Sequence, residues 1–185
     1  MRQQTRTWGG TWTDQKLEAF EKYVSAYLAI MNKHRDKWGW QIIYFDAFAG
    51  SGSIPNVTDQ TNVNPSLFSE LAIDETEANL YKGAAERVLS IEQRGFDGYH
   101  FIDRNKSAND ALKNKLSHFK KHHEKMVFQS GDANNQIIKF AGAMKRTSKL
   151  KALVLLDPFG MQVDWTSLEQ FKGTGVDLWI WSPRA

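Results

Sequence analysis

Five short apolar runs, separated by stretches of helical periodicity, constrain the fold of this 185-residue chain more than any other feature. The runs are rich in β-branched and aromatic residues, and their length is typical of strands buried on both faces of a parallel sheet. They occupy residues 42–45, 99–102, 152–156 and 176–181, with a weaker run at 126–128. The pattern therefore predicts a sheet of five strands.

Helical patterns lie between these runs. In the first, from Asp14, apolar residues spaced by three and four indicate an amphipathic helix with Thr13 as its N-cap: Leu17, Phe20, Val24, Tyr27, Leu28 and Met31. Further helices are expected over 84–93, 107–122 and 136–144, and a capping box at 166–169 predicts a short helix that ends at Gly173. Strands that alternate with helices favour an α/β fold with a parallel sheet.

The length fits a single domain over residues 1–185. We expect residues 1–38 to form an N-terminal helical extension and residues 39–185 to form the α/β core. A polar stretch at about 53–80, which holds Pro55 and Pro65, is expected to be an insertion or a long loop.

Composition excludes several classes of protein. The absence of cysteine excludes disulfides, thiolate metal sites and a cysteine nucleophile. No run approaches the roughly 18 apolar residues of a membrane span, and no apolar signal region follows the charged N-terminus, so we expect a cytoplasmic protein with no membrane partner. A net charge of +3 indicates only a weak preference for polyanions.

Acidic residues follow four consecutive strands. Asp46 and the loop Gly50-Ser51-Gly52 follow the first strand, Asp103 the second, Asp132 the third and Asp157 the fourth. In open parallel sheets, ligands bind beyond the carboxyl ends of the strands, where the topology reverses. Each residue alone fits a tight turn or a helix cap equally well, but their joint placement predicts a ligand site.

The glycine loop allows three interpretations. A dinucleotide loop needs a third glycine, where this chain has Pro55, and a phosphate-binding P-loop needs a Gly-Lys-Ser/Thr ending that is absent. S-adenosylmethionine has no pyrophosphate, and its adenosine needs an acid after the second strand and a polar group after the third. The sequence favours this ligand over NAD.

Two motifs carry a resemblance to a known family. Residues 43–52 (IYFDAFAGSG) resemble the first motif of class I methyltransferases, and together with residues 155–160 (LLDPFG) they look most like the three-Cys-motif partner protein family. Residues 23–28 and 82–84 fit the same family. The resemblance implies a Rossmann-like class I methyltransferase sheet with flanking helices, and S-adenosyl-L-methionine as cofactor.

The resemblance also implies roles for single residues. Asp46, Ala49, Gly50 and Gly52 would line the methionine and ribose end of the cofactor, Asp103 would accept hydrogen bonds from the ribose hydroxyls, and Asp132 with Ala133 would face the adenine. Asp157, Pro158 and Phe159 would be catalytic, because they stand where amino-group methyltransferases place an Asp/Asn-Pro-Pro-Tyr/Phe motif that orients the target amine. The chain has one proline where that motif has two, so Phe159 arrives one residue early.

We therefore expect a methyltransferase-like enzyme that modifies nucleic acid, with an amino group of a base as one candidate target. The alternative is a non-catalytic module that keeps the fold and binds another protein. Class I methyltransferases add two strands after the fifth, so the resemblance implies a chain truncated after that strand. Alternatively, a protein partner or a second copy would cover an exposed edge at residues 176–181.

Three further features are candidates for binding a metal, phosphates or a base. His118 and His122 are four residues apart on one predicted helix face, a spacing that fits zinc, although a solvated basic face is favoured over a metal site. The neighbouring lysines could contact phosphates without regard to base sequence: Lys115, Lys120, Lys121 and Lys125. Trp165 is a candidate stacking surface near the site.

Overall fold

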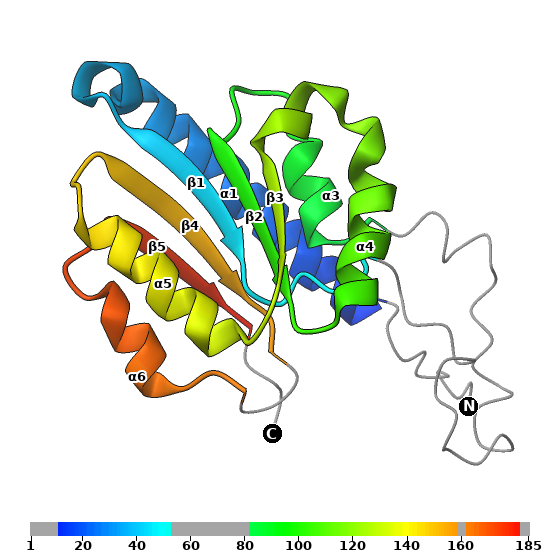
Figure 1. The fold of residues 1–185 in the computed structure, drawn as a ribbon. Helices are drawn as coiled ribbons and strands as arrows, with labels where there is room; N and C mark the ends of the chain where they lie inside the picture. The colour runs from blue at the N-terminus through cyan, green and yellow to red at the C-terminus, as the bar shows by residue number, and fades with distance from the viewer. Residues whose placement is uncertain (1–10, 53–81, 159–161, 182–185) are drawn as a thin grey trace, which may run out of the picture.

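The computed structural model describes residues 11–52, 82–158 and 162–181. Its sheet is entirely parallel, in the order β3-β2-β1-β4-β5 (Figure 1). The strands are β1 (Gln41–Asp46), β2 (Gly98–Asp103), β3 (Met126–Ser130), β4 (Leu150–Leu156) and β5 (Val176–Ile180). All five predicted strands are confirmed, and the topology reverses between β1 and β4, as in Rossmann-like proteins.

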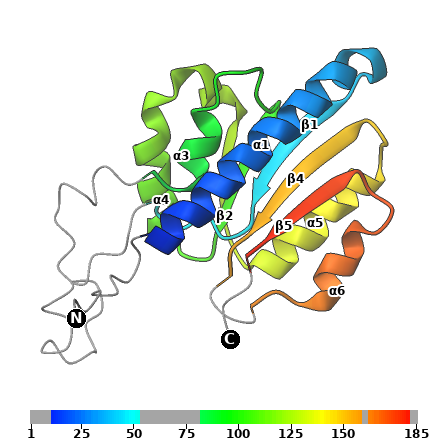
Figure 2. The ribbon, with the colours of Figure 1, turned by 180° about the vertical axis from the view of Figure 1, so that it is seen from behind.

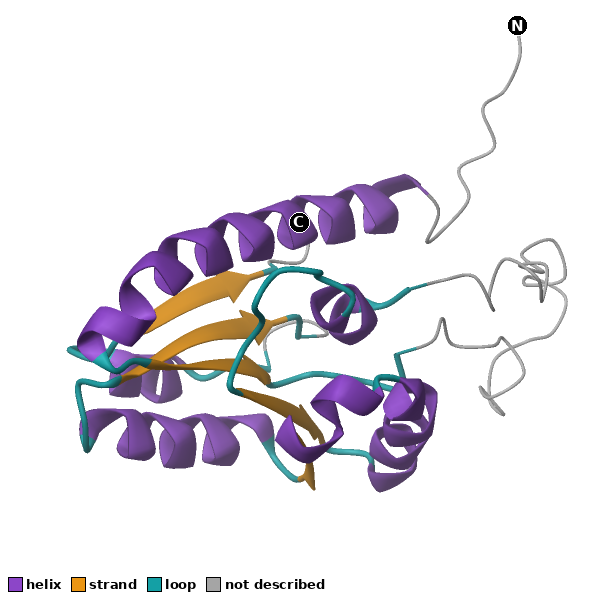
Figure 3. Ribbon diagram, turned by 90° about the horizontal axis from the view of Figure 1, so that it is seen from above, coloured by secondary structure: helices purple, strands orange, loops and turns teal. Residues whose placement is uncertain are grey.

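Helices cover both faces of the sheet (Figures 2 and 3). One face carries α1 (Thr11–Trp38), α3 (Ala84–Leu89) and α4 (Lys106–Lys115). The other carries α5 (Ala133–Lys145), the short α6 (Trp165–Leu168) and the 3-10 segment η5 (Glu169–Phe171). Within the described residues, no helix is both long and apolar enough to cross a membrane.

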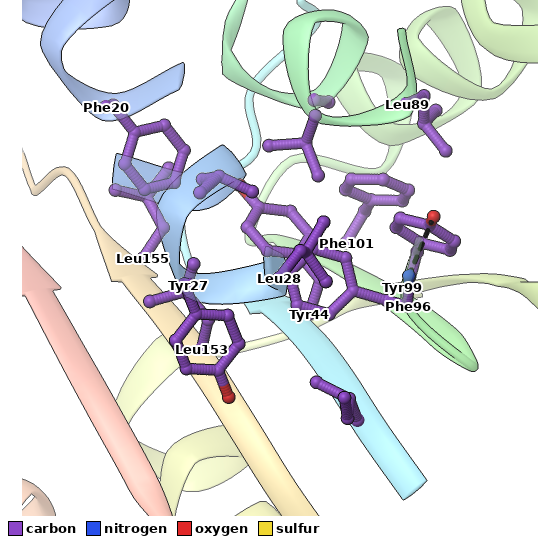
Figure 4. Packing of buried hydrophobic residues seen from close by; sticks show 14 of the residues in the cluster. Phe20, Tyr27, Leu28, Tyr44, Leu89, Phe96, Tyr99, Phe101, Leu153 and Leu155 are labelled. Carbon is purple, nitrogen blue, oxygen red and sulfur yellow. Dashed lines mark hydrogen bonds between the residues drawn. The ribbon is translucent and has the colours of Figure 1, made fainter. Parts of the chain in front are cut away.

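The larger core lies between the sheet and α1. Side chains of β1 alternate, so that Tyr44 faces α1 and Phe45 faces α5. Around Tyr44, the ring centroids of Phe20 and Phe101 lie 6.4 and 6.0 Å away (Figure 4). The apolar face predicted for α1 packs here, and this packing fixes the helix across the length of the sheet.

A buried arginine attaches the end of α1 to the amino edge of the sheet. The Nη1 atom of Arg35 donates to the carbonyl of Gly95 at 3.0 Å, and its Nη2 atom forms an ion pair with Asp97. The same Asp97 carboxylate accepts the backbone N–H of Ile42 at 2.8 Å. The ion pair of Arg35 and Asp97 therefore joins helix α1, strand β1 and the turn before β2.

Several predicted helix ends are wrong. The cap expected at Thr13 is not one, because α1 already begins at Thr11. The helix expected over 84–93 ends at Leu89, because Phe96, a few residues further on, is fully buried and the chain must leave the helix to reach the core. The capping box at 166–169 does not form: Asp164 is the N-cap, and Glu169 accepts the indole N–H of Trp165 at 3.0 Å instead.

The helix expected over 107–122 is also shorter than predicted. It ends at Lys115, and the chain continues as two 3-10 segments, η3 (Leu116–His118) and η4 (Lys120–Lys125). Phe119 separates them with a ψ of 60°, which no α-helix allows. Burial of Leu116 and His122 on either side of this residue accounts for the break, since tertiary packing overrides local helical periodicity.

Strand β5 is the edge of the described sheet, and one of its faces is covered. Trp179 and Trp181 pack on α1, with ring centroids 5.6 and 5.4 Å from that of Phe20. Leu178 and Ile180, on the other face, are 39% and 48% exposed. The exposed edge expected at residues 176–181 is thus confirmed for Leu178 and Ile180, and it is wrong for Trp179 and Trp181. The insertion expected at about 53–80 lies outside the described residues.

Candidate functional site at the carboxyl rim of the sheet

The strand order gathers three of the predicted acids around the point of reversal. Asp46 ends the central strand β1, while Asp103 ends β2 on one side and Asp157 follows β4 on the other. Asp132, which follows β3 at the sheet edge, is further out. We call the part of this edge formed by Asp46, Asp103 and Asp157 the acidic rim.

Asp46 is the buried member of the acidic rim, with a side chain closed off from solvent. Its two oxygens accept the backbone N–H of Phe48 at 3.1 Å and the hydroxyl of Tyr44 at 3.2 Å. Burial, and to a smaller extent the negative charges of Asp157 and Asp103, raise the pKa of this carboxyl to about 7, although the two hydrogen bonds act in the opposite direction. Asp46 is therefore a group that changes its protonation near neutral pH.

The loop after β1 is held to both neighbouring strands. The backbone N–H of Ala47 donates to the carbonyl of Leu155 on β4 at 3.1 Å, and that of Ala49 donates to the carbonyl of Ile102 on β2 at 2.9 Å. These bonds seat the loop across the reversal point. They also give it a fixed position relative to the acidic rim.

The two glycines of this loop differ in their surroundings. Both have positive φ angles, 61° for Gly50 and 70° for Gly52, which favour glycine. A Cβ on Gly50 would meet no atom closer than 4.0 Å, whereas one on Gly52 would lie 2.7 Å from Cδ1 of Leu112. Gly52 therefore has a packing role against α4, while the backbone at Gly50 remains open to an approaching ligand.

Asp103 connects the glycine loop to the end of β2. Its Oδ2 atom accepts the N–H of Gly50 at 2.9 Å, and its Oδ1 atom accepts the N–H of Asn105 at 2.7 Å. Each carboxylate oxygen has two lone pairs, so both oxygens can accept one further hydrogen bond. A vicinal diol, such as the one on a ribose, presents two donors at the spacing of a carboxylate.

At β3, the exposed Asp132 caps α5 by accepting the N–H of Asn135 at 3.0 Å. Ala133 is buried in the core between the sheet and α5. The exposed polar group at this strand end is thus the carboxylate, and it performs the ordinary function of a helix cap.

At β4, a lysine that the sequence analysis missed contacts the expected catalytic carboxylate. Lys16 of α1 donates to Oδ1 of Asp157 at 2.7 Å, with the two side chains 22% and 41% exposed. Its ammonium also lies 4.1 Å from the ring centroid of Trp181. One signal could have found it: a helix antiparallel to the strands brings its first turns to their carboxyl ends. Pro158 follows Asp157, and Phe159 lies outside the described residues.

The other candidates lie elsewhere. His118 and His122 do not share a helix face, because they belong to separate 3-10 segments, and burial with two lysines nearby lowers the pKa of His122. Among the described residues, no three potential metal ligands gather. Trp165 is 72% exposed. A surface hollow of about 210 Å³ lies by the amino half of β3, away from the acidic rim, and is lined by Lys113, Ser117, His123, Met126 and Phe128.

The fold defines the class of protein as Rossmann-like α/β. No protein-family model and no curated protein match the chain. Among solved structures, the chain is similar to a conserved hypothetical protein from Streptococcus pyogenes, with 16% identity, coverage of 80% of this chain and 68% of that one, and a TM-score of 0.42.

Proposed function

We propose that this protein is an S-adenosylmethionine-dependent methyltransferase-like enzyme that acts on nucleic acid in the cytoplasm. The observation that carries the proposal is the bond between Asp103 and the N–H of Gly50 at the reversal point of the sheet. This bond places the carboxylate of Asp103, which can accept hydrogen bonds from a diol, next to the backbone of Gly50, where there is open space for a ligand. The resemblance to the three-Cys-motif partner family is part of the same proposal.

The residues present fit this cofactor. Asp103 would accept the ribose hydroxyls, Asp132 with Ala133 would lie toward the adenine, and Asp46, Ala49, Gly50 and Gly52 would border the methionine end. When bound, S-adenosylmethionine supplies a methyl group on a sulfonium, and the acidic rim favours that positive charge. Asp157 would accept a hydrogen bond from the target amine and so orient its lone pair, which is the main demand of methyl transfer.

Calorimetry with three ligands tests the proposal. We expect S-adenosylmethionine and S-adenosylhomocysteine to bind and NAD not to bind, and we expect Asp103→Ala to weaken the first two at least about tenfold, the effect of losing hydrogen bonds to a charged group. Asp110→Ala is the matched control, because this acid on α4 is exposed and pairs with Lys106. Failure of both sulfur ligands to bind, or equal affinity in the Asp103 variant, contradicts the proposal.

A non-catalytic module is the second candidate, and the half-exposed Leu178 and Ile180 on β5 favour it, because they offer an apolar surface to a protein partner or a second copy. Labelled methyl groups distinguish the two functions. Incorporation into bulk RNA or DNA that is lost in Asp157→Asn supports the enzyme, whereas cofactor binding without incorporation supports the module.

A further inference from the structure

The positive charge of this protein is concentrated in one short segment. Residues 113–125 hold five lysines and one glutamate, a net charge of +4, whereas the whole chain has +3. The rest of the chain therefore has a net charge of −1. This asymmetry indicates a local electrostatic surface, which the overall composition hides.

The break after α4 arranges these charges around the surface hollow. In one continuous helix, the lysines would follow the helix axis, but η3 and η4 bend the chain back toward β3. The hollow is lined by Lys113, Ser117 and His123 together with Met126 and Phe128 of β3. Cationic and polar groups thus border a partly apolar floor that includes one aromatic ring.

The lysines of this surface are available to a ligand. Four are exposed and lack an ion-pair partner among the described residues: Lys113, Lys120, Lys121 and Lys125. By contrast, Lys106 and Lys115 of α4 are paired with Asp110 and Glu86. We call these four lysines, together with the residues that line the hollow, the β3-edge surface; Lys113 belongs to both sets.

We propose that the β3-edge surface binds single-stranded nucleic acid without regard to sequence, with phosphates on the lysines and an unpaired base in the hollow. Lysines contact phosphates as point charges, and every base has a flat face that can lie against Phe128 or Met126. A duplex keeps its bases stacked inside and cannot place one in the hollow. The hollow lies beside Met126 and Phe128, in the amino half of β3, whereas the acidic rim lies at the carboxyl ends of β1, β2 and β4, so the surface is a separate contact that needs no cofactor.

Fluorescence anisotropy with a labelled oligothymidylate of 20 nucleotides, measured without added cofactor, tests this proposal. The variant Lys113→Glu/Lys120→Glu/Lys121→Glu reverses three charges of the surface. The control Lys33→Glu/Lys139→Glu/Lys172→Glu reverses three exposed lysines on α1, on α5 and after η5. Three phosphate contacts on a single strand contribute a slope of about 2 to the dependence of log affinity on log salt, or about 20-fold between 50 and 200 mM.

We expect the first variant to bind at least about tenfold more weakly at 50 mM salt and to lose about 2 units of that slope. The control should behave like the wild type, and a duplex of the same length should bind more weakly than the single strand. Equal weakening in both variants, tighter binding of the duplex, or equal binding to vesicles with one fifth phosphatidylserine overturns the inference. Because no cofactor is present, a failure here leaves the calorimetric test untouched.

Discussion

Replacing the two glycines of the loop after β1 separates packing from backbone conformation. Both residues have positive φ angles, so an alanine at either position is disfavoured by the same backbone term of about 1–2 kcal/mol. Only at Gly52 does the added Cβ collide, at 2.7 Å, with a side chain. That side chain, Leu112, is 1% exposed and cannot swing out into solvent.

The magnitudes follow from this difference. Gly50→Ala should lower the free energy of unfolding by about 1–2 kcal/mol, the cost of the backbone conformation alone. Gly52→Ala should lower it by about 2–5 kcal/mol, because moving a packed core side chain adds about 1–3 kcal/mol. For a chain of this size, each kcal/mol corresponds to roughly 2–4 °C in Tm.

Urea unfolding followed by far-UV circular dichroism, with thermal melts as a second measure, checks both values. The order of the two variants is the decisive result. If Gly50→Ala is as destabilising as Gly52→Ala, the contact with Leu112 is not what requires glycine at residue 52. In the cofactor titration, Gly50→Ala should weaken binding more than Gly52→Ala does, since we propose that the ligand approaches the open backbone at Gly50.

Two further predictions concern charged groups at the acidic rim. Because the pKa of Asp46 is raised to about 7, the folded protein keeps a proton that the unfolded chain loses above pH 4, so this group favours folding at low pH and that stability is lost as pH rises toward 7. Asp46→Asn should therefore match the wild type near pH 4 and exceed it above pH 7, by up to about 4 kcal/mol, in urea unfolding at a series of pH values; a constant difference would contradict the assigned pKa. Lys16→Met should lower the free energy of unfolding by about 1 kcal/mol, since its ion pair with Asp157 is partly exposed. Most of that loss should vanish in a background of Asp157→Asn, while Lys22→Met, which breaks an exposed pair with Glu18, serves as control; purely additive effects would rule out the coupling.

The strands were predictable because each is a contiguous apolar run, and burial on both faces leaves a signal that needs no knowledge of the partner strand. Such runs at 152–156 and 99–102 became β4 and β2 with only small shifts of their ends. Where four strands end in acids, the parallel topology alone was sufficient to bring three of them to one place.

The helix ends and the lysine at the rim depended on tertiary contacts instead. Local periodicity continues through Phe119, but the α-helix ends at Lys115 and the 3-10 continuation breaks at Phe119, because Leu116 and His122 on either side are buried. Lys16 belongs to no sequence motif, and its contact with Asp157 follows only from the direction in which α1 crosses the sheet. The raised pKa of Asp46 likewise comes from complete burial, which an aspartate at a strand end does not reveal in sequence.

The contact that Lys16 of α1 makes with Asp157 has a consequence for access to the rim. Near the amino edge of the sheet, Arg35 is 1% exposed, and its ion pair with Asp97 connects α1 with the turn before β2 and with β1, so that end can separate only together with the core. Near the carboxyl edge, Leu17 is buried and Arg87 pairs with Asp14 and Glu21, but at Asp157 itself α1 is held by Lys16, which also contacts the indole face of Trp181. Breaking the contact between Lys16 and Asp157 is therefore a local opening of the native state, and it costs much less free energy than global unfolding. If the protein methylates an amine as proposed, that amine would compete with Lys16 for Asp157, at a cost far below that of unfolding the domain.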